Sequence, residues 1–157
     1  LDTDVELLKK PDFLLENQCY IGIQQPESLC TTGLGFGAQK SSPVVQKMME
    51  CYDSISFTDQ KKSTFACPWL NDKVIRSFGK VSNEDITYLK EVTVYPPRFF
   101  DPLSTGNTKN LLCDETVSIH HYAATWAGNK QRWKRKLIRF FGEDRYFKLK
   151  KLFRRVQ

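Results

Sequence analysis

The sequence predicts an α/β domain, because short apolar segments with strand character alternate with segments of helical periodicity. Apolar residues make up 40% of the 157 residues, and the 11 Phe, 6 Tyr and 3 Trp among them supply bulky side chains for one core. The longest apolar runs are too short to cross a bilayer. We therefore expect a globular domain rather than a disordered or membrane-spanning chain.

The first segment is expected to combine a strand end with a short helix. Asp2 and Asp4 would lie at the end of an extended strand, and the following stretch LLKKPDFLL has a helical pattern. An acidic strand end followed by a short helix is typical of α/β domains. The apolar run Cys19–Ile23 then predicts a buried strand.

A glycine-rich strand and a helix are expected next. The segment 31–38, TTGLGFGA, predicts a strand whose glycines let another backbone or a ligand approach closely. Ser41, Ser42 and Pro43 predict a helix start, with an N-cap and a proline in the first turn. That helix is expected over 44–52.

The later elements are expected to be short. A helix is predicted over 69–78, and a strand over 92–95 that Pro96 and Pro97 stop. A further strand or strand end is predicted over 117–122.

The charge distribution divides the chain into a body and a tail. Residues 1–128 contain 12 Lys or Arg and 16 Asp or Glu, whereas residues 129–157 contain 12 and 2. The pattern predicts a mildly acidic body over 1–128 and a basic, amphipathic helical tail over 129–157. The tail can be a solvated face packed on the body, an interfacial helix on anionic lipid, or a nucleic-acid-binding segment. Nucleic acid is the least favoured partner, because the body is acidic and carries no nucleic-acid-binding motif.

The pattern Asp2-Thr3-Asp4 is the first candidate for chemistry. On an extended segment, residues two positions apart point the same way, so two carboxylates would share one face. Such a pair can bind a hard divalent cation, Mg²⁺ or Mn²⁺, which can neutralise the charge on a departing diphosphate. A solvated acidic turn is the alternative interpretation.

The two histidines of the chain, His120 and His121, are adjacent. On a strand they would face opposite ways, so at most one is expected to point into a given site. A neutral imidazole can complete a Mn²⁺ coordination sphere begun by carboxylates. A packing or surface histidine is the alternative.

Other catalytic patterns are absent from the sequence. Gly33, Gly35 and Gly37 alternate, which is not the GxGxxG fingerprint, so a Rossmann cofactor site is rejected. Alternate glycines can provide a smooth floor for a sugar or allow close packing against a helix. There is no P-loop, HExxH or GxSxG pattern, and the five cysteines include no CxxC pair.

Four segments, in order, resemble one family, the family 32 glycosyltransferases. They are LDTDVELLKKPDFLL, the pair CYIGIQQPES and TTGLGFGAQKSSP, VTVYPPRFFDPLSTGN, and ETVSIHHYAATW. Each motif is weak alone, but the ordered set over residues 1–128 is specific. This family includes fungal initiating α-1,6-mannosyltransferases and bacterial enzymes of capsule and exopolysaccharide synthesis.

The resemblance implies a GT-A-like fold, an α/β sandwich with a mostly parallel central sheet and the DXD motif at a strand end. It also implies a retaining, metal-dependent transfer that uses Mn²⁺ or Mg²⁺. Asp2 and Asp4 would be the catalytic residues of the metal site: Asp2 would contact the ribose or, through water, the metal, and Asp4 would ligate the metal directly. One of His120 and His121 would complete the coordination sphere. The implied substrate-binding residues are Thr32, Gly33, Gly35, Tyr122 and Trp126.

The resemblance further implies the substrates and the location. The donor would be a nucleotide-sugar and the acceptor a glycan or a lipid-linked oligosaccharide, at the cytoplasmic face of the cell membrane. Family members carry further strands before the DXD motif, so we expect an N-terminally truncated chain that binds nucleotide-sugars poorly and can be inactive in isolation. The alternative is a catalytically inactive, membrane-associated binding or scaffold module that uses the basic tail.

Overall fold

The computed structural model describes residues 1–25, 27–53, 55, 66–104, 109–123 and 145. A four-stranded sheet has the strand order β3-β2-β5-β4, and a separate two-stranded sheet pairs β1 with β6. The strands are β1 (Val5–Leu7), β2 (Cys19–Ile23), β3 (Cys30–Ala38), β4 (Thr87–Tyr88), β5 (Thr93–Tyr95) and β6 (Ser118–His120). The helices are the 3₁₀ helix η1 (Asp12–Glu16) and the α-helices α1 (Pro43–Asp53), α2 (Cys67–Arg76) and α3 (Pro97–Phe100).

The larger sheet is mixed. Strands β2 and β5 run parallel, whereas β2 with β3 and β4 with β5 run antiparallel. The mixture of helices and a mixed sheet agrees with the predicted α/β class. The family resemblance implied a mostly parallel sheet. The described strands instead form one parallel and two antiparallel pairs.

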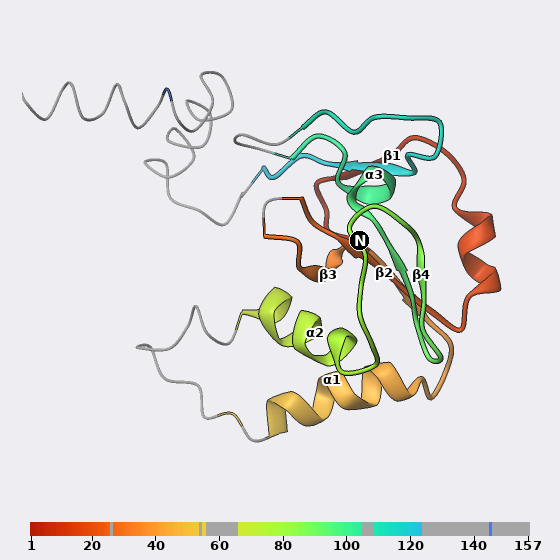
Figure 1. The fold of residues 1–157 in the computed structure, drawn as a ribbon, viewed down its shortest axis with the longest axis vertical. Helices are drawn as coiled ribbons and strands as arrows, with labels where there is room; N and C mark the ends of the chain where they lie inside the picture. Colours follow the sequence, from red (N-terminus) through yellow and green to blue (C-terminus); the bar gives the residue numbers. More distant parts are fainter. Residues whose placement is uncertain (26, 54, 56–65, 105–108, 124–144, 146–157) are drawn as a thin grey trace, which may run out of the picture.

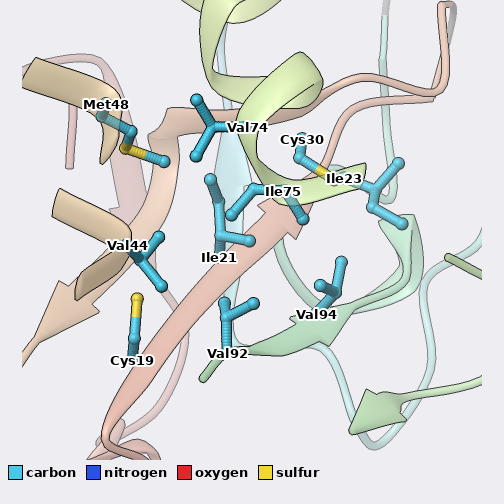
Figure 2. Packing of buried hydrophobic residues seen from close by; sticks show 10 residues of the cluster. All are labelled: Cys19, Ile21, Ile23, Cys30, Val44, Met48, Val74, Ile75, Val92 and Val94. Carbon is cyan, nitrogen blue, oxygen red and sulfur yellow. The ribbon is translucent and has the colours of Figure 1, made fainter. Parts of the chain in front are cut away.

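One face of the sheet packs against α1 and α2. Side chains alternate along a strand, so Cys19, Ile21 and Ile23 of β2 all point to this face. They pack with residues of both helices, among them Val44 and Ile75, both fully buried. Figure 2 shows this cluster, in which side chains from α1, α2, β2 and β5 meet.

The opposite face packs against η1, α3 and the β1–β6 pair (Figure 1). Its cluster includes Leu14, Tyr95 and the neighbouring Phe99 and Phe100. Phe100, only 1% exposed, lies against Gly22, since a Cβ there would be 2.7 Å from the ring. The β1–β6 pair, which contains His120 and directly follows Asp4, is therefore held on this second face.

The sequence predicts most elements within two residues. The strand at Cys19–Ile23 and the helix start at Pro43 are confirmed, and the helix expected over 69–78 is α2. It begins earlier, at Cys67, with a proline in its first turn. The strand expected over 117–122 is β6, which is shorter because Tyr122 has a positive φ of 50°.

The prediction for the first segment is wrong in two respects. The strand follows Asp4 instead of ending at it, and LLKKPDFLL forms part of β1 and then η1 instead of one helix. Strand β1 pairs antiparallel with β6, more than a hundred residues away, in the register Val5 with His120 and Leu7 with Ser118. This long-range pairing overrides the local helical pattern.

Two predicted features lie outside the described residues. They are the basic tail over 129–157, apart from Arg145, and the substrate-binding residue Trp126. Within the described ranges, none of the helices combines the length and the apolar character needed to cross a membrane.

Candidate metal centre

Three segments that are far apart in the sequence meet at one end of the β1–β6 pair. The backbone N–H of His121 donates to the Asp4 carbonyl at 2.9 Å, which extends the pairing of β1 with β6 to the DXD motif. The backbone N–H of Asp2 donates to the Gly33 carbonyl at 2.8 Å, which ties the same motif to β3.

A break in the register of β3 makes the second contact. Tyr20 and Ile21 pair with Gly37 and Phe36, but Gly22 pairs with Thr31. The segment 32–35 therefore has no pairing partner on β2 and forms a bulge in the strand. Such bulges are frequent next to functional sites. The bulge carries Gly33 to the Asp2 backbone.

Asp4 is held with one carboxylate oxygen available. Its Oδ2 accepts the backbone N–H of Ala123 at 2.7 Å, and its Oδ1 lies 3.2 Å from Nε2 of His120. Partial burial raises the pKa of Asp4, but the Ala123 N–H and the nearby His120 outweigh this effect and lower the pKa overall. The carboxylate form is therefore favoured.

His120 points its imidazole at both carboxylates. Its Nε2 also lies 3.7 Å from Oδ2 of Asp2, and the residue is only 9% exposed. Among the described residues, the buried Nδ1 has no hydrogen-bond partner, and Nε2 has only its approach to the two carboxylates, without hydrogen-bond geometry. A buried nitrogen without such a partner is costly unless it binds something else.

The geometry of this group fits a divalent cation. One ligand atom each from Asp2, Asp4 and His120 can be chosen so that all lie within 4.8 Å of one another. Octahedral ligands at about 2.1 Å from an ion lie about 3 Å apart when adjacent and about 4.2 Å apart when opposite. Two carboxylate oxygens and one imidazole nitrogen favour Mn²⁺ over Mg²⁺, because magnesium prefers oxygen ligands. The residues present therefore fit the ion that the sequence predicted.

The structure does not bring the second histidine to this group. Nε2 of His121 lies 2.8 Å from Oε2 of Glu6, and both side chains are about half exposed. The two histidines face opposite ways, as expected for adjacent residues at the end of a strand. His120 is the histidine that the structure places at the centre.

The predicted substrate-binding residues of β3 divide into two groups. Thr32 and Gly33 are both half-buried, but only Gly33 is in contact with the centre, where a Cβ on it would lie 2.5 Å from Oδ2 of Asp2. The Thr32 hydroxyl accepts a hydrogen bond from the side-chain amide of Asn71 at 3.2 Å. Gly35 is buried, and a Cβ there would lie 2.8 Å from the Phe100 ring, so it packs against α3 and does not line an open site.

Tyr122 contacts the centre through His120. Its ring lies edge-to-face on the imidazole, with centroids 4.1 Å apart. Its hydroxyl donates to Oδ2 of Asp101 at 2.7 Å. Burial and the charge of Asp101 raise the pKa of the phenol, which keeps it a hydrogen-bond donor.

Asp101 is the residue that sequence reasoning missed. It directly follows α3 and is not among the candidate site residues singled out in the sequence, yet it is fully buried. Burial raises its pKa, although the Gln25 N–H and the Tyr122 and Ser104 hydroxyls partly oppose the rise. The only sequence signal was an acidic residue directly after the aromatic pair Phe99-Phe100.

A surface hollow elsewhere contains none of the predicted site residues. It lies between the end of β3 and α1, and its lining includes Gly37, Ser42, Gln46 and Met49. Its lining shares no residue with the group of Asp2, Asp4 and His120, so the metal centre remains the candidate site.

Comparisons with known proteins do not identify the chain. No protein-family model, no curated protein and no solved structure matched it.

Proposed function

We propose that the chain carries the metal- and donor-binding part of a retaining glycosyltransferase of the family 32 type, with a GT-A-like fold. The reaction would transfer a sugar from a nucleotide-sugar to a glycan or lipid-linked acceptor of surface polysaccharide, at the cytoplasmic face of the membrane. The observation that carries this proposal is the convergence of Asp2, Asp4 and His120 within 4.8 Å. The ordered sequence motifs supply the choice of reaction.

The donor set suits the stabilisation of a leaving diphosphate. A bound divalent cation would neutralise the charge that develops on the departing nucleotide diphosphate. The chain's own residues prepare for this step. Asp4 is fixed by the Ala123 N–H, so this proposed ligand is oriented before any ion binds.

The half-buried backbone at Gly33 borders the group, and together with the neighbouring Thr32 it is the proposed contact surface for the donor sugar. The absence of a side chain at Gly33 leaves room for the Asp2 carboxylate, so this glycine serves the centre as well as the strand.

The experiment that tests this function measures linked binding of Mn²⁺ and nucleotides. Electron paramagnetic resonance reports free Mn²⁺ as the chain is titrated with and without UDP or GDP. If an ion held by the carboxylates also contacts the diphosphate, UDP and GDP should tighten Mn²⁺ binding. The corresponding nucleoside monophosphates, UMP and GMP, should tighten it far less. Coupling of this kind is reciprocal and typically amounts to about 5- to 150-fold.

Two variants make the experiment specific. Asp4→Asn removes a proposed ligand while keeping the size of the side chain, and should abolish the coupling. His121→Ala changes the histidine that lies beside Glu6 and should leave the coupling intact. Inorganic pyrophosphate, which needs no base-binding region, is the further probe: Mn²⁺ binding that neither pyrophosphate nor the nucleoside diphosphates strengthen would contradict a transferase role and leave only a metal-binding one.

A further inference from the structure

Tyr122 adopts a backbone conformation that needs a structural reason. Its φ of 50° lies in the left-handed region, which a bulky residue rarely adopts without support from its surroundings. Tyr122 lies two residues after the end of β6 and directly precedes Ala123, whose N–H donates to Asp4. Such strained positions cluster at functional sites, where the surroundings hold them in place.

The side chain of Tyr122 joins the metal centre to a rigid anchor. Its ring contacts the His120 imidazole at 4.1 Å and its hydroxyl reaches Oδ2 of Asp101. The same Oδ2 accepts the backbone N–H of Gln25 at 2.8 Å, and the Asp101 backbone N–H donates to Pro97 at 2.8 Å. Asp101 is 0% exposed, so α3 and the segment after β2 both fix its position.

His120 lacks the support that a ligating histidine usually has. Such a histidine commonly donates its second ring N–H to a carboxylate or carbonyl, which fixes the tautomer and the ring orientation. Within the described ranges, Nδ1 of His120 has no such partner. Besides the approach of Nε2 to the carboxylates, the structure instead gives the edge-to-face contact with Tyr122, which can orient the imidazole.

Resting on the proposed metal-dependent function, we infer that Tyr122 and Asp101 are positioning residues that hold the His120 imidazole toward Asp2 and Asp4. Tyr122 transmits the fixed position of Asp101 to the ring, in place of a direct hydrogen bond to Nδ1. Neither residue contacts the ion in this arrangement.

The test is a double-mutant cycle on Mn²⁺ affinity. Tyr122→Phe keeps the ring but removes the hydroxyl that reaches Asp101, and should weaken Mn²⁺ binding by about 10-fold, the lower end for residues that orient a ligand. In a His120→Ala background, where the carboxylates still bind Mn²⁺ weakly, the same change should have no further effect. A structural role alone would give the same loss in both backgrounds, which would overturn the inference.

Tyr95→Phe is the matched control. Tyr95 is buried, whereas Tyr122 is half-buried. The Tyr95 hydroxyl accepts a hydrogen bond from Asn17 at 3.2 Å, but the neighbours of Tyr95 belong to the apolar cluster. It should leave Mn²⁺ affinity unchanged. An equal loss of affinity in Tyr95→Phe and Tyr122→Phe would also overturn the inference.

A metal-free measurement separates this inference from the proposed function. The chain has two histidines, so long-range ¹H–¹⁵N spectra of the imidazoles are simple, and His121→Ala assigns them. In Tyr122→Phe, the His120 resonances should broaden or shift to a mixture of tautomers. If the unmodified chain bound no Mn²⁺, the proposed function would fail. The positioning role would then be judged from the His120 resonances alone. A change in Tyr122→Phe would support this role, and unchanged resonances would contradict it.

Discussion

At the scale of single residues, Gly33 lies directly against the Asp2 carboxylate. A Cβ built on Gly33 would lie 2.5 Å from Oδ2 and 2.9 Å from Cγ of Asp2. The φ of Gly33 lies outside the left-handed region, so alanine meets no backbone strain there. The Asp2 side chain is 59% exposed and can swing into solvent. Room for this carboxylate is therefore what the glycine provides.

Gly33→Ala should consequently separate affinity from stability. We expect Mn²⁺ binding to weaken by about 10-fold or more, because the displaced carboxylate no longer faces His120. The free energy of unfolding should change by less than about 1 kcal/mol, because an exposed side chain moves at little cost. Mn²⁺ titration and urea denaturation measure the two effects. Unchanged Mn²⁺ affinity in a folded variant would show that Asp2 is not a ligand.

Asp101 gives a pH dependence with a definite sign. Burial raises its pKa above the ordinary value of 3.8, so the folded state binds this proton more tightly than the unfolded state. Its contribution to stability is fully present below about pH 3.8 and is lost as the pH rises through the raised folded value. Asp4, whose pKa is lowered, acts in the opposite direction and loses its contribution as the pH falls.

Asp101→Asn should therefore remove one component of the stability profile. As the pH rises from 3 toward 7, the wild type should lose unfolding free energy relative to this variant. Urea denaturation of both chains across this range, compared at each pH, cancels the shared contribution of Asp4. A difference that stays constant with pH would mean that Asp101 has an ordinary pKa and is less buried than described.

The sequence predicted the residues of the centre better than their surroundings. Asp2, Asp4 and a histidine were predicted because DXD and HH are compact patterns of ligand side chains. The choice of His120 needed the register of β1 with β6. Asp101 was missed because its partners Gln25 and Tyr122 lie 76 and 21 residues away, and no local pattern records such contacts.

At the scale of elements, α3 packs the Phe100 ring against β2 and β3 at positions where these strands carry glycine instead of a side chain. The Phe100 ring fills the space beside Gly22 of β2 and Gly35 of β3. A Cβ on Gly35 would lie 2.8 to 3.0 Å from three atoms of this ring, which is buried and has little room to move. The alternating glycines of β3 therefore serve packing at position 35 and the centre at position 33.

Gly35→Ala is the counterpart of the Gly33 variant. Forcing a methyl group into this packed face should lower the free energy of unfolding by about 1–3 kcal/mol. Mn²⁺ affinity of the remaining folded protein should stay within about 2-fold of wild type, since no ligand is displaced. Thermal and urea denaturation measure the first effect. A stable variant with weakened Mn²⁺ binding would instead mean that Gly35 lines the site.

The local sequence pattern predicted those elements whose own residues are buried together in the core. The run CYIGI is apolar throughout because β2 lies inside the sheet between β3 and β5. The first segment was mispredicted because β1 is three residues long and depends on pairing with β6. The bulge at 32–35 was not predicted either, since a register break depends on the partner strand.

At the scale of the whole molecule, chain topology makes the centre. The DXD motif near the start and the histidine near residue 120 meet because β1 and β6 form an antiparallel pair on the second face of the sheet. The bulge of β3 adds a third contact through Gly33. Folding should therefore assemble the ligands, and binding of an ion should stabilise the folded chain by an amount that rises with its concentration.

The most direct test of the account compares two adjacent residues. Mn²⁺ affinity is measured by electron paramagnetic resonance for the wild type, His120→Ala and His121→Ala. We predict that His120→Ala weakens binding by at least about 10-fold, because it removes a ligand, whereas His121→Ala stays within about 2-fold. Equal affinities in all three chains, or a larger loss in His121→Ala, would contradict a metal centre built from Asp2, Asp4 and His120.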